Sequence, residues 1–189
     1  MSSLDCLLKG YQIILNKLPD EKKVVFSIDD NLAPSLKDNN AFEAAIEEKG
    51  SLQALIGYSD EMCCTIFDIV DQLKNERQFE DGSNALLFLM MLKPFVSGCW
   101  IILGELWTEM HRIDDALYAY LVAINCAPFE LEPYQYAIRF CLANNHKPEA
   151  LRILDYGLEF TASHELCSEE EKALPEQLRL IKAYVESVK

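Results

Sequence analysis

Histidine, cysteine and carboxylate side chains are the groups of this chain that could bind a metal or carry out catalysis. The histidines are His111, His146 and His164, and each falls in or beside a predicted turn between helices, where a solvated side chain is the ordinary outcome. His164 and Cys167 have a spacing that two zinc ligands could use, but no second His or Cys pair lies nearby in sequence to complete a site. No nucleophile motif or glycine-rich phosphate loop occurs. We therefore expect a protein that is not an enzyme and that binds no metal or cofactor.

The cysteines have the pattern of reduced core thiols. They are odd in number, most fall in apolar helical stretches, and none forms the C-x-x-C spacing of a metal or redox site. Cys63 and Cys64 are adjacent, so their side chains should leave one helix in two directions, with one in the core. A redox sensor is the alternative reading of this pair. The complete set is Cys6, Cys63, Cys64, Cys99, Cys126, Cys141 and Cys167.

The charge of the chain excludes some classes of partner. Its 17 basic and 31 acidic residues give a net charge of -14, which disfavours nucleic acid as a ligand. The apolar runs, such as residues 85–92, are too short to cross a bilayer, so no stable membrane insertion is expected. The N-terminus lacks the pattern of a signal peptide, and a cytoplasmic location is predicted.

A repeated pattern of helix pairs organises the chain. Residues 97–130 read SGCWIILGELWTEMHRIDDALYAYLVAINCAPFE. A large, a small and a large residue on a first helix are followed by a small, an aromatic and a small residue on a second, and then by a proline: Trp100, Gly104, Trp107, Ala116, Tyr120, Ala123 and Pro128. This is the spacing of a tetratricopeptide repeat. Gly104 and Ala116 are small enough to let two antiparallel helices approach closely.

The pattern returns at a step of 34 residues. Ile138, for example, stands 34 positions after Gly104, since 138 − 104 is 34. Three repeats are therefore predicted, at residues 63–96, 97–130 and 131–164. Because Val70 and Ile138 stand where the central repeat has Gly104, the outer helix pairs could be splayed or shifted by a residue. The predicted fold class is all-α, with three tetratricopeptide helix pairs in a right-handed superhelical stack, N-terminal helices and a C-terminal capping helix.

The segments outside the repeats are predicted as follows. Residues 1–18 form an amphipathic helix, residues 19–40 a loop or linker in which 22–28 could be extended, and residues 41–62 a helical lead-in capped by Asn39 or Asn40. Residues 165–189 form the capping helix, with Pro175 in its first turn. The apolar stripe of the first helix could pack on the repeats, act as a partner-binding arm, or form a dimer contact through Leu4, Leu7, Leu8, Tyr11, Ile14 and Leu15.

The first helices of the three pairs are expected to line a concave groove that binds a peptide or helix. The groove has apolar patches and acids, which suits an apolar peptide with basic flanks better than a peptide's C-terminal carboxylate. The positions predicted to face the groove are Cys64, Phe67, Asp71 and Lys74 in the first repeat, Gly98, Ile101, Glu105 and Thr108 in the second, and Glu132, Gln135, Arg139 and Leu142 in the third.

From about residue 51 to its end, the chain resembles the class II chaperones of bacterial type III secretion systems. The stretches that carry the resemblance are LKNERQFEDG, CWIILGELWTEMHRIDDALYAYLVAINCAP and YQYAIRFCLANNHKPEALRIL. Residues 1–50 are longer and more elaborate than the usual start of this family, so no role is transferred to them.

The resemblance implies a cytoplasmic, non-catalytic protein that keeps hydrophobic translocators, or another type III secretion protein, soluble before secretion. Such chaperones accept a short segment with P-x-L-x-x-P spacing in the groove. Transferred to this chain, the pocket-lining residues would be Phe67, Ile101, Gln135 and Leu142, and the residues that set polarity would be Asp71, Glu105 and Arg139. The alternative for Phe67 and Ile101 is that they complete the core between adjacent helices.

Three functional alternatives stay open at this level. The chain could be a scaffold of the secretion apparatus, a co-chaperone that wraps the helix of a needle subunit, or a general tetratricopeptide adaptor outside secretion. A helical client would place anchors at i, i+3, i+4 and i+7. Family members often dimerise through N-terminal helices, so a homodimer is a further hypothesis.

Overall fold

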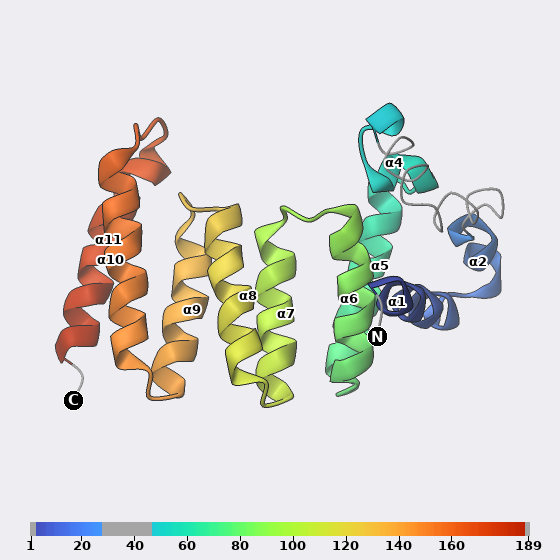
Figure 1. Ribbon diagram of the computed structural model, residues 1–189, viewed down its shortest axis with the longest axis horizontal. Helices are drawn as coiled ribbons and strands as arrows, with labels where there is room; N and C mark the ends of the chain where they lie inside the picture. Colours follow the sequence, from blue (N-terminus) through green and yellow to red (C-terminus); the bar gives the residue numbers. More distant parts are fainter. Residues whose placement is uncertain (1–2, 28–46, 188–189) are drawn as a thin grey trace. The chain divides into compact units, whose positions relative to one another are not determined.

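The computed structural model of this protein describes residues 3–27 and 47–187, and the side chains from residue 8 onward within those ranges. All secondary structure in this part of the chain is helical (Figure 1). The chain forms two compact units, Met1–Pro94 and Phe95–Lys189, and each is described by itself. Among the described residues, no helix is both long enough and apolar enough to span a membrane.

Three helix pairs occur where the repeats are predicted. The first helix of each pair ends 34 residues after the previous one, since 109 − 75 and 143 − 109 are both 34. The second helices begin at the same interval, at residues 79, 113 and 147. The pairs are α5 (Asp60–Asn75) with α6 (Phe79–Leu92), α7 (Ser97–Glu109) with α8 (Ile113–Cys126), and α9 (Leu131–Ala143) with α10 (Lys147–Ser163).

The turn inside each pair has one backbone geometry. Arg77, His111 and Asn145 have φ angles of 58°, 57° and 59°, in the left-handed region that residues other than glycine seldom adopt. The amide of the next residue donates to a carbonyl five residues earlier, as from Arg112 N to Trp107 O at 2.8 Å, with the same bond in the other two turns. This is the Schellman arrangement of a helix end. The shared bonds show that the turns of the outer pairs are not shifted in register. Of the two possibilities considered for these pairs, the shift by a residue is therefore wrong.

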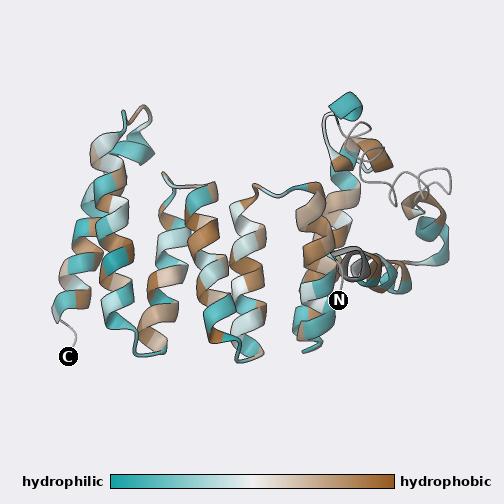
Figure 2. Cartoon of the chain, viewed as in Figure 1, coloured by the Kyte–Doolittle hydropathy of each residue, from teal (hydrophilic) through white to brown (hydrophobic). Residues whose placement is uncertain are grey.

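In the first unit, three of the described helices pack against α6. The helices α1 (Ser3–Lys17), α4 (Leu52–Ile56) and α5 all contact it. Figure 2 shows the hydrophobic residues of α6 gathered in its C-terminal half, which contains the apolar run 85–92. Gly10 of α1 lies directly against the backbone carbonyl of Asn84, and Ile14 is completely buried. The part of the apolar stripe of α1 around Ile14 is therefore covered within the same unit.

Part of the predicted linker 19–40 is helical. Residues Asp20–Phe26 form α2, with Pro19 at its N-cap. The acids in its first turn interact favourably with the positive end of the helix dipole. Phe26 is buried against Tyr58, with ring centroids 5.5 Å apart, and its carbonyl accepts a 2.6 Å hydrogen bond from the Tyr58 hydroxyl. This tertiary anchor selects helix over the extended conformation considered for residues 22–28. Asn39, Asn40 and residue 28 lie outside the described residues.

In the second unit, α7 to α11 pack in succession around one hydrophobic core. A Cβ added to Gly104 would lie 2.7 Å from the ring of Tyr120, so the close approach of α7 and α8 requires glycine there. Gly157 plays the same role in the next pair, where an added Cβ would lie 2.7 Å from the ring of Tyr134 and 2.8 Å from Leu178. The role predicted for Gly104 is confirmed.

The last helix, α11 (Glu169–Ser187), covers α10 with Leu174, Leu178 and Val185 buried. The prediction that Pro175 lies in the first turn of this helix is wrong, because Pro175 lies inside the helix. The helix begins earlier because Ser168 and Glu171 form a capping box: Glu171 N donates to Ser168 Oγ at 3.0 Å, and Ser168 N donates to Glu171 Oε2 at 3.2 Å.

Candidate functional site

The groove positions of the second unit lie on α7 and α9, which contact each other. On α9, Gln135 and Arg139 are exposed and Leu142 is half-buried. The Arg139 guanidinium lies over the ring of Tyr136, at 5.7 Å from the guanidinium carbon to the ring centroid, and Tyr136 in turn stacks on Tyr120. This edge of α9 therefore presents a cation, an amide and an aromatic face, a combination that can hold an apolar peptide and orient its polar groups.

The α7 positions differ from one another in exposure. Glu105 and Thr108 are half-buried, and the Thr108 hydroxyl donates to Gly104 O at 2.7 Å. Ile101 is only 5% exposed and belongs to the core that α7 shares with α8 and α9. The prediction that Ile101 lines a peptide pocket is wrong in this structure, and the alternative that it completes the core between adjacent helices holds.

The groove positions of the first unit lie on α5. Cys64 and Asp71 are exposed, while Phe67 and Lys74 are half-buried. Asp71 accepts a 3.3 Å hydrogen bond from Asn75 one turn later. The partial burial of Phe67 allows it either to contact a ligand or to complete the packing of α5.

The predicted dimer contact meets a different environment. Ile14 is completely buried, Tyr11 packs against Phe88 with ring centroids 5.8 Å apart, and Leu15 is half-buried. Leu8 is 46% exposed, whereas the side chains of Leu4 and Leu7 lie outside the described residues. A dimer contact through Ile14 is thus wrong, because Ile14 is already buried within its own unit.

The thiols follow the expected division between core and surface. Cys63 is buried and Cys64 exposed, as their adjacency on one helix predicts. Burial raises the pKa of Cys141 to about 11, which makes it a poor nucleophile. Over residues 3–27 and 47–187, no group of three or more His, Cys, Asp or Glu side chains is placed to hold a metal ion. His164 instead stacks on Phe160, with ring centroids 4.0 Å apart.

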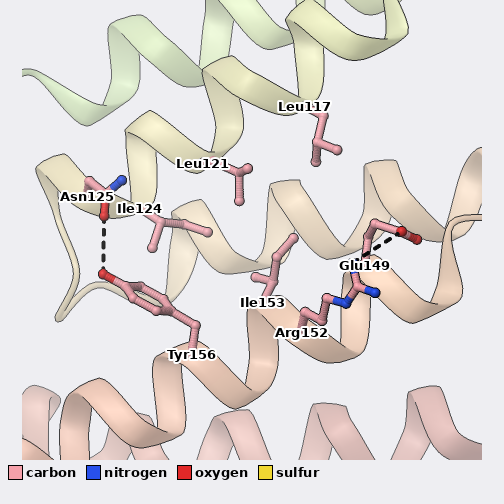
Figure 3. Close-up of a pocket in the computed structure, with 8 residues that line it drawn as sticks. All are labelled: Leu117, Leu121, Ile124, Asn125, Glu149, Arg152, Ile153 and Tyr156. Atoms are coloured by element: carbon pink, nitrogen blue, oxygen red, sulfur yellow. Dashed lines mark hydrogen bonds and ion pairs between the residues drawn. The ribbon is translucent and has the colours of Figure 1, made fainter.

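One surface feature was missed by the sequence analysis. An apolar slot of about 360 Å³ lies between α8 and α10 (Figure 3). Figure 3 shows Leu117, Leu121 and Ile124 of α8 and Ile153 of α10 directed into this α8–α10 slot. The sequence suggests a binding surface only on the first helix of each pair, and no role was predicted for these three α8 residues, which have i, i+4, i+7 spacing. Only Ile124 among them is fully buried.

Polar pairs stand at the two ends of the slot. Tyr156 donates to Asn125 Oδ1 at 3.2 Å at one end, and the Arg152 guanidinium lies 3.8 Å from Glu149 Oε1 at the other. The middle of the slot is lined by aliphatic side chains. It can therefore accept apolar side chains of a partner, with polar groups available only at its ends.

Comparison with known proteins gives matches among solved structures. No family model and no curated protein sequence matches the chain. One chain of a type III secretion (T3SS) complex from Aeromonas hydrophila is 14% identical, with 79% of this chain and 97% of that chain covered and a TM-score of 0.57. The type III secretion translocator chaperone SycD of Yersinia enterocolitica is 18% identical, with 71% and 97% covered and a TM-score of 0.54.

A chain of the CopN–Scc3 complex is 22% identical and has a TM-score of 0.54. This match covers 96% of the present chain and 99% of the other. It therefore also extends into residues 1–50, the segment that is longer than the usual start of the family that the sequence resembles. These likenesses run over nearly the whole length of each solved chain. The protein therefore has the all-α fold of the type III secretion translocator chaperones.

Proposed function

We propose that this protein is a type III secretion chaperone that holds a hydrophobic translocator, or a similar secreted protein, by a short extended segment bound to the first helices of the repeats in its second unit. The observation that carries the proposal is the likeness of fold to the translocator chaperone SycD, which covers 97% of that chain. A second solved structure with this fold contains PcrH in complex with the chaperone-binding region of PopD. The matched chain is 14% identical to this protein, with a TM-score of 0.51.

The chemistry of the α9 surface supports the same proposal. Gln135 and Arg139 are exposed and offer an amide and a guanidinium to the carbonyls of an extended segment, while Leu142 and Tyr136 offer apolar contacts. A proline-rich segment is already extended in solution, so it binds a preformed surface at a low ordering cost. The net charge of -14 favours a segment with basic flanks.

The test is the affinity of the full-length protein for a fluorescent peptide with P-x-L-x-x-P spacing, measured by anisotropy. The proposal expects micromolar binding that is lost when the two prolines and the leucine of the peptide are changed to alanine. The protein variant is Gln135→Trp, which places a bulky ring at an exposed position and leaves the core intact. Ile101 is unsuitable for substitution because it is buried.

The matched control is Gln177→Trp, the same change at an exposed position of α11. Circular dichroism must show equal helicity for both variants. A loss of binding in Gln135→Trp but not in Gln177→Trp supports the proposal. Equal binding of the two peptides, or equal binding by the two variants, contradicts it and favours a scaffold or a helical client.

A further inference from the structure

The α8–α10 slot carries an inference that is independent of the proposed function. Its floor is closed by Ile124 and Ile153, which are 2% and 6% exposed, while its walls retain exposed apolar surface at Leu121 (39%) and Tyr156 (44%). The slot belongs entirely to the second unit. It is formed by the second helices of two repeats, whereas the proposed peptide surface is formed by first helices.

The conformation of an occupant follows from the polar groups that the slot can offer. An extended segment lying in the aliphatic middle would bury its N–H and C=O groups without partners, which is costly. The polar groups at the ends are already joined in the pairs Tyr156–Asn125 and Arg152–Glu149. A helix satisfies its own backbone hydrogen bonds, so it can lie along the slot at no such cost.

The dimensions agree with a helix. On α8 the lining of the slot from Leu117 to Ile124 spans seven residue steps, or about 10 Å at the helical rise, which matches two turns of a partner helix. Leu117, Leu121 and Ile124 lie on one face of α8, and apolar residues at i, i+4 and i+7 of a partner helix can interdigitate with them.

The charge of the occupant follows from the surrounding carboxylates. The helices α8 and α10 together carry five acids (Asp114, Asp115, Glu149, Asp155 and Glu159) and two cations (Lys147 and Arg152). With Arg112 and Lys182, which pair with two of these acids from outside the helices, the net charge is 4 − 5 = −1. Three of the acids have cationic partners: Asp115 has Arg112, Asp155 has Lys182, and Glu149 has Arg152.

Asp114 and Glu159 are exposed and make no ion pair within the described residues. A basic partner is therefore attracted and an acidic one repelled. We infer that the α8–α10 slot is a second docking site of this protein, and that its occupant is a basic amphipathic helix of a partner protein.

The probe is a fluorescein-labelled peptide of about 18 residues, or five helical turns. It has leucines at i, i+4, i+7 and i+11, with lysine, arginine and alanine elsewhere. Three altered peptides accompany it. One has the same composition in scrambled order, one has glutamate in place of every cation, and one has a central proline that breaks the helix. Anisotropy is measured with the full-length protein.

The protein variants are Leu121→Glu in the slot and Leu180→Glu as the matched control, since Leu180 is 65% exposed on α11 of the same unit. Circular dichroism and urea unfolding must show that both are folded. We expect the basic helix to bind at least about tenfold more tightly than each altered peptide. Leu121→Glu should weaken binding at least about tenfold, and Leu180→Glu less than about twofold.

Several outcomes overturn the inference. Equal binding of the proline peptide shows an extended occupant, equal binding of the glutamate peptide removes the charge argument, and equal loss in the two variants shows that binding is elsewhere. A dimer that Leu121→Glu converts to a monomer, seen by light scattering, shows instead that a second copy covers the slot. Because the P-x-L-x-x-P peptide and Gln135→Trp test the first-helix surface separately, failure of either proposal leaves the other measurable.

Discussion

Substitution of Gly104 by alanine tests the close approach of α7 and α8. Alanine is favoured over glycine inside a helix by about 1 kcal/mol. The new Cβ would however lie 2.7 Å from Cε1 and Cζ of Tyr120, which is 4% exposed and is held by Phe140 at 5.3 Å between ring centroids. Overpacking of this kind costs about 1–3 kcal/mol. We predict a net destabilisation of about 1 kcal/mol, the difference between the middle of that range and the helix gain.

The matched control is Gly98→Ala on the same helix, where an added Cβ meets nothing within 4 Å. That variant should be stabilised by about 0.5 kcal/mol, less than the full helix gain because Gly98 lies in the first turn. Urea unfolding followed by circular dichroism gives both values. In a Tyr120→Leu background the ring is absent, so Gly104→Ala should become stabilising. If Gly104→Ala is as stable as Gly98→Ala in the wild-type background, the argument for close approach is refuted.

Three further predictions concern single groups. Arg77→Gly should stabilise the protein by about 1 kcal/mol and Asn145→Gly by much less, because asparagine tolerates the left-handed conformation better than arginine. Equal urea midpoints for the two variants would contradict this difference in stability. Cys141 should resist iodoacetamide at about pH 8 until the protein is unfolded, because burial raises its pKa to about 11; mass spectrometry of the folded protein would detect early labelling. Hydrogen bonds from Lys93 and Gln53 hold the pKa of the Asp60 carboxyl below its ordinary value of 3.8. The destabilisation caused by Asp60→Asn should therefore be present at about pH 6 and vanish as the pH falls through that lowered pKa. A difference in stability that persists at lower pH would argue against the pairing.

The repeat register could be predicted from sequence because it depends on local residue types. Small residues at Gly104 and Ala116 and a closing Pro128 define where helices meet and end, and the observed bounds follow the same 34-residue step. The left-handed residues of the turns were not predicted. Arg77 and His111 carry no glycine signal, and the Schellman bonds of the helix ends hold them in that conformation.

Errors arose where tertiary contact or an unrecognised cap decided the structure. The helix α2 forms because Phe26 docks on Tyr58, a contact 32 residues away that no local pattern reveals. The start of α11 could have been found, since Ser168 and Glu171 have the spacing of a capping box, but the proline six residues into the helix was given more weight. Ile101 was assigned to the groove because spacing alone cannot distinguish a ligand-facing residue from one that fills the gap between adjacent helices.

The α8–α10 slot could not be recognised from sequence for a related reason. Leu117, Leu121 and Ile124 follow helical spacing, and such a stripe usually packs into a core. The structure shows that Leu121 stays 39% exposed, because the second helices of neighbouring repeats are separated at this surface. The sequence thus predicts an apolar face, and only the packing of neighbouring helices decides how much of it is covered.

The most direct test of the proposed chaperone function is to locate the bound segment. A peptide with P-x-L-x-x-P spacing, carrying benzoylphenylalanine in place of its leucine, is irradiated with the full-length protein, and the attached residues are identified by mass spectrometry. The proposal predicts attachment to α9 at or beside Gln135, Arg139 or Leu142, and its loss in the Gln135→Trp variant. Attachment to α8 and α10 around Leu121, or attachment that Gln135→Trp leaves unchanged, would contradict it.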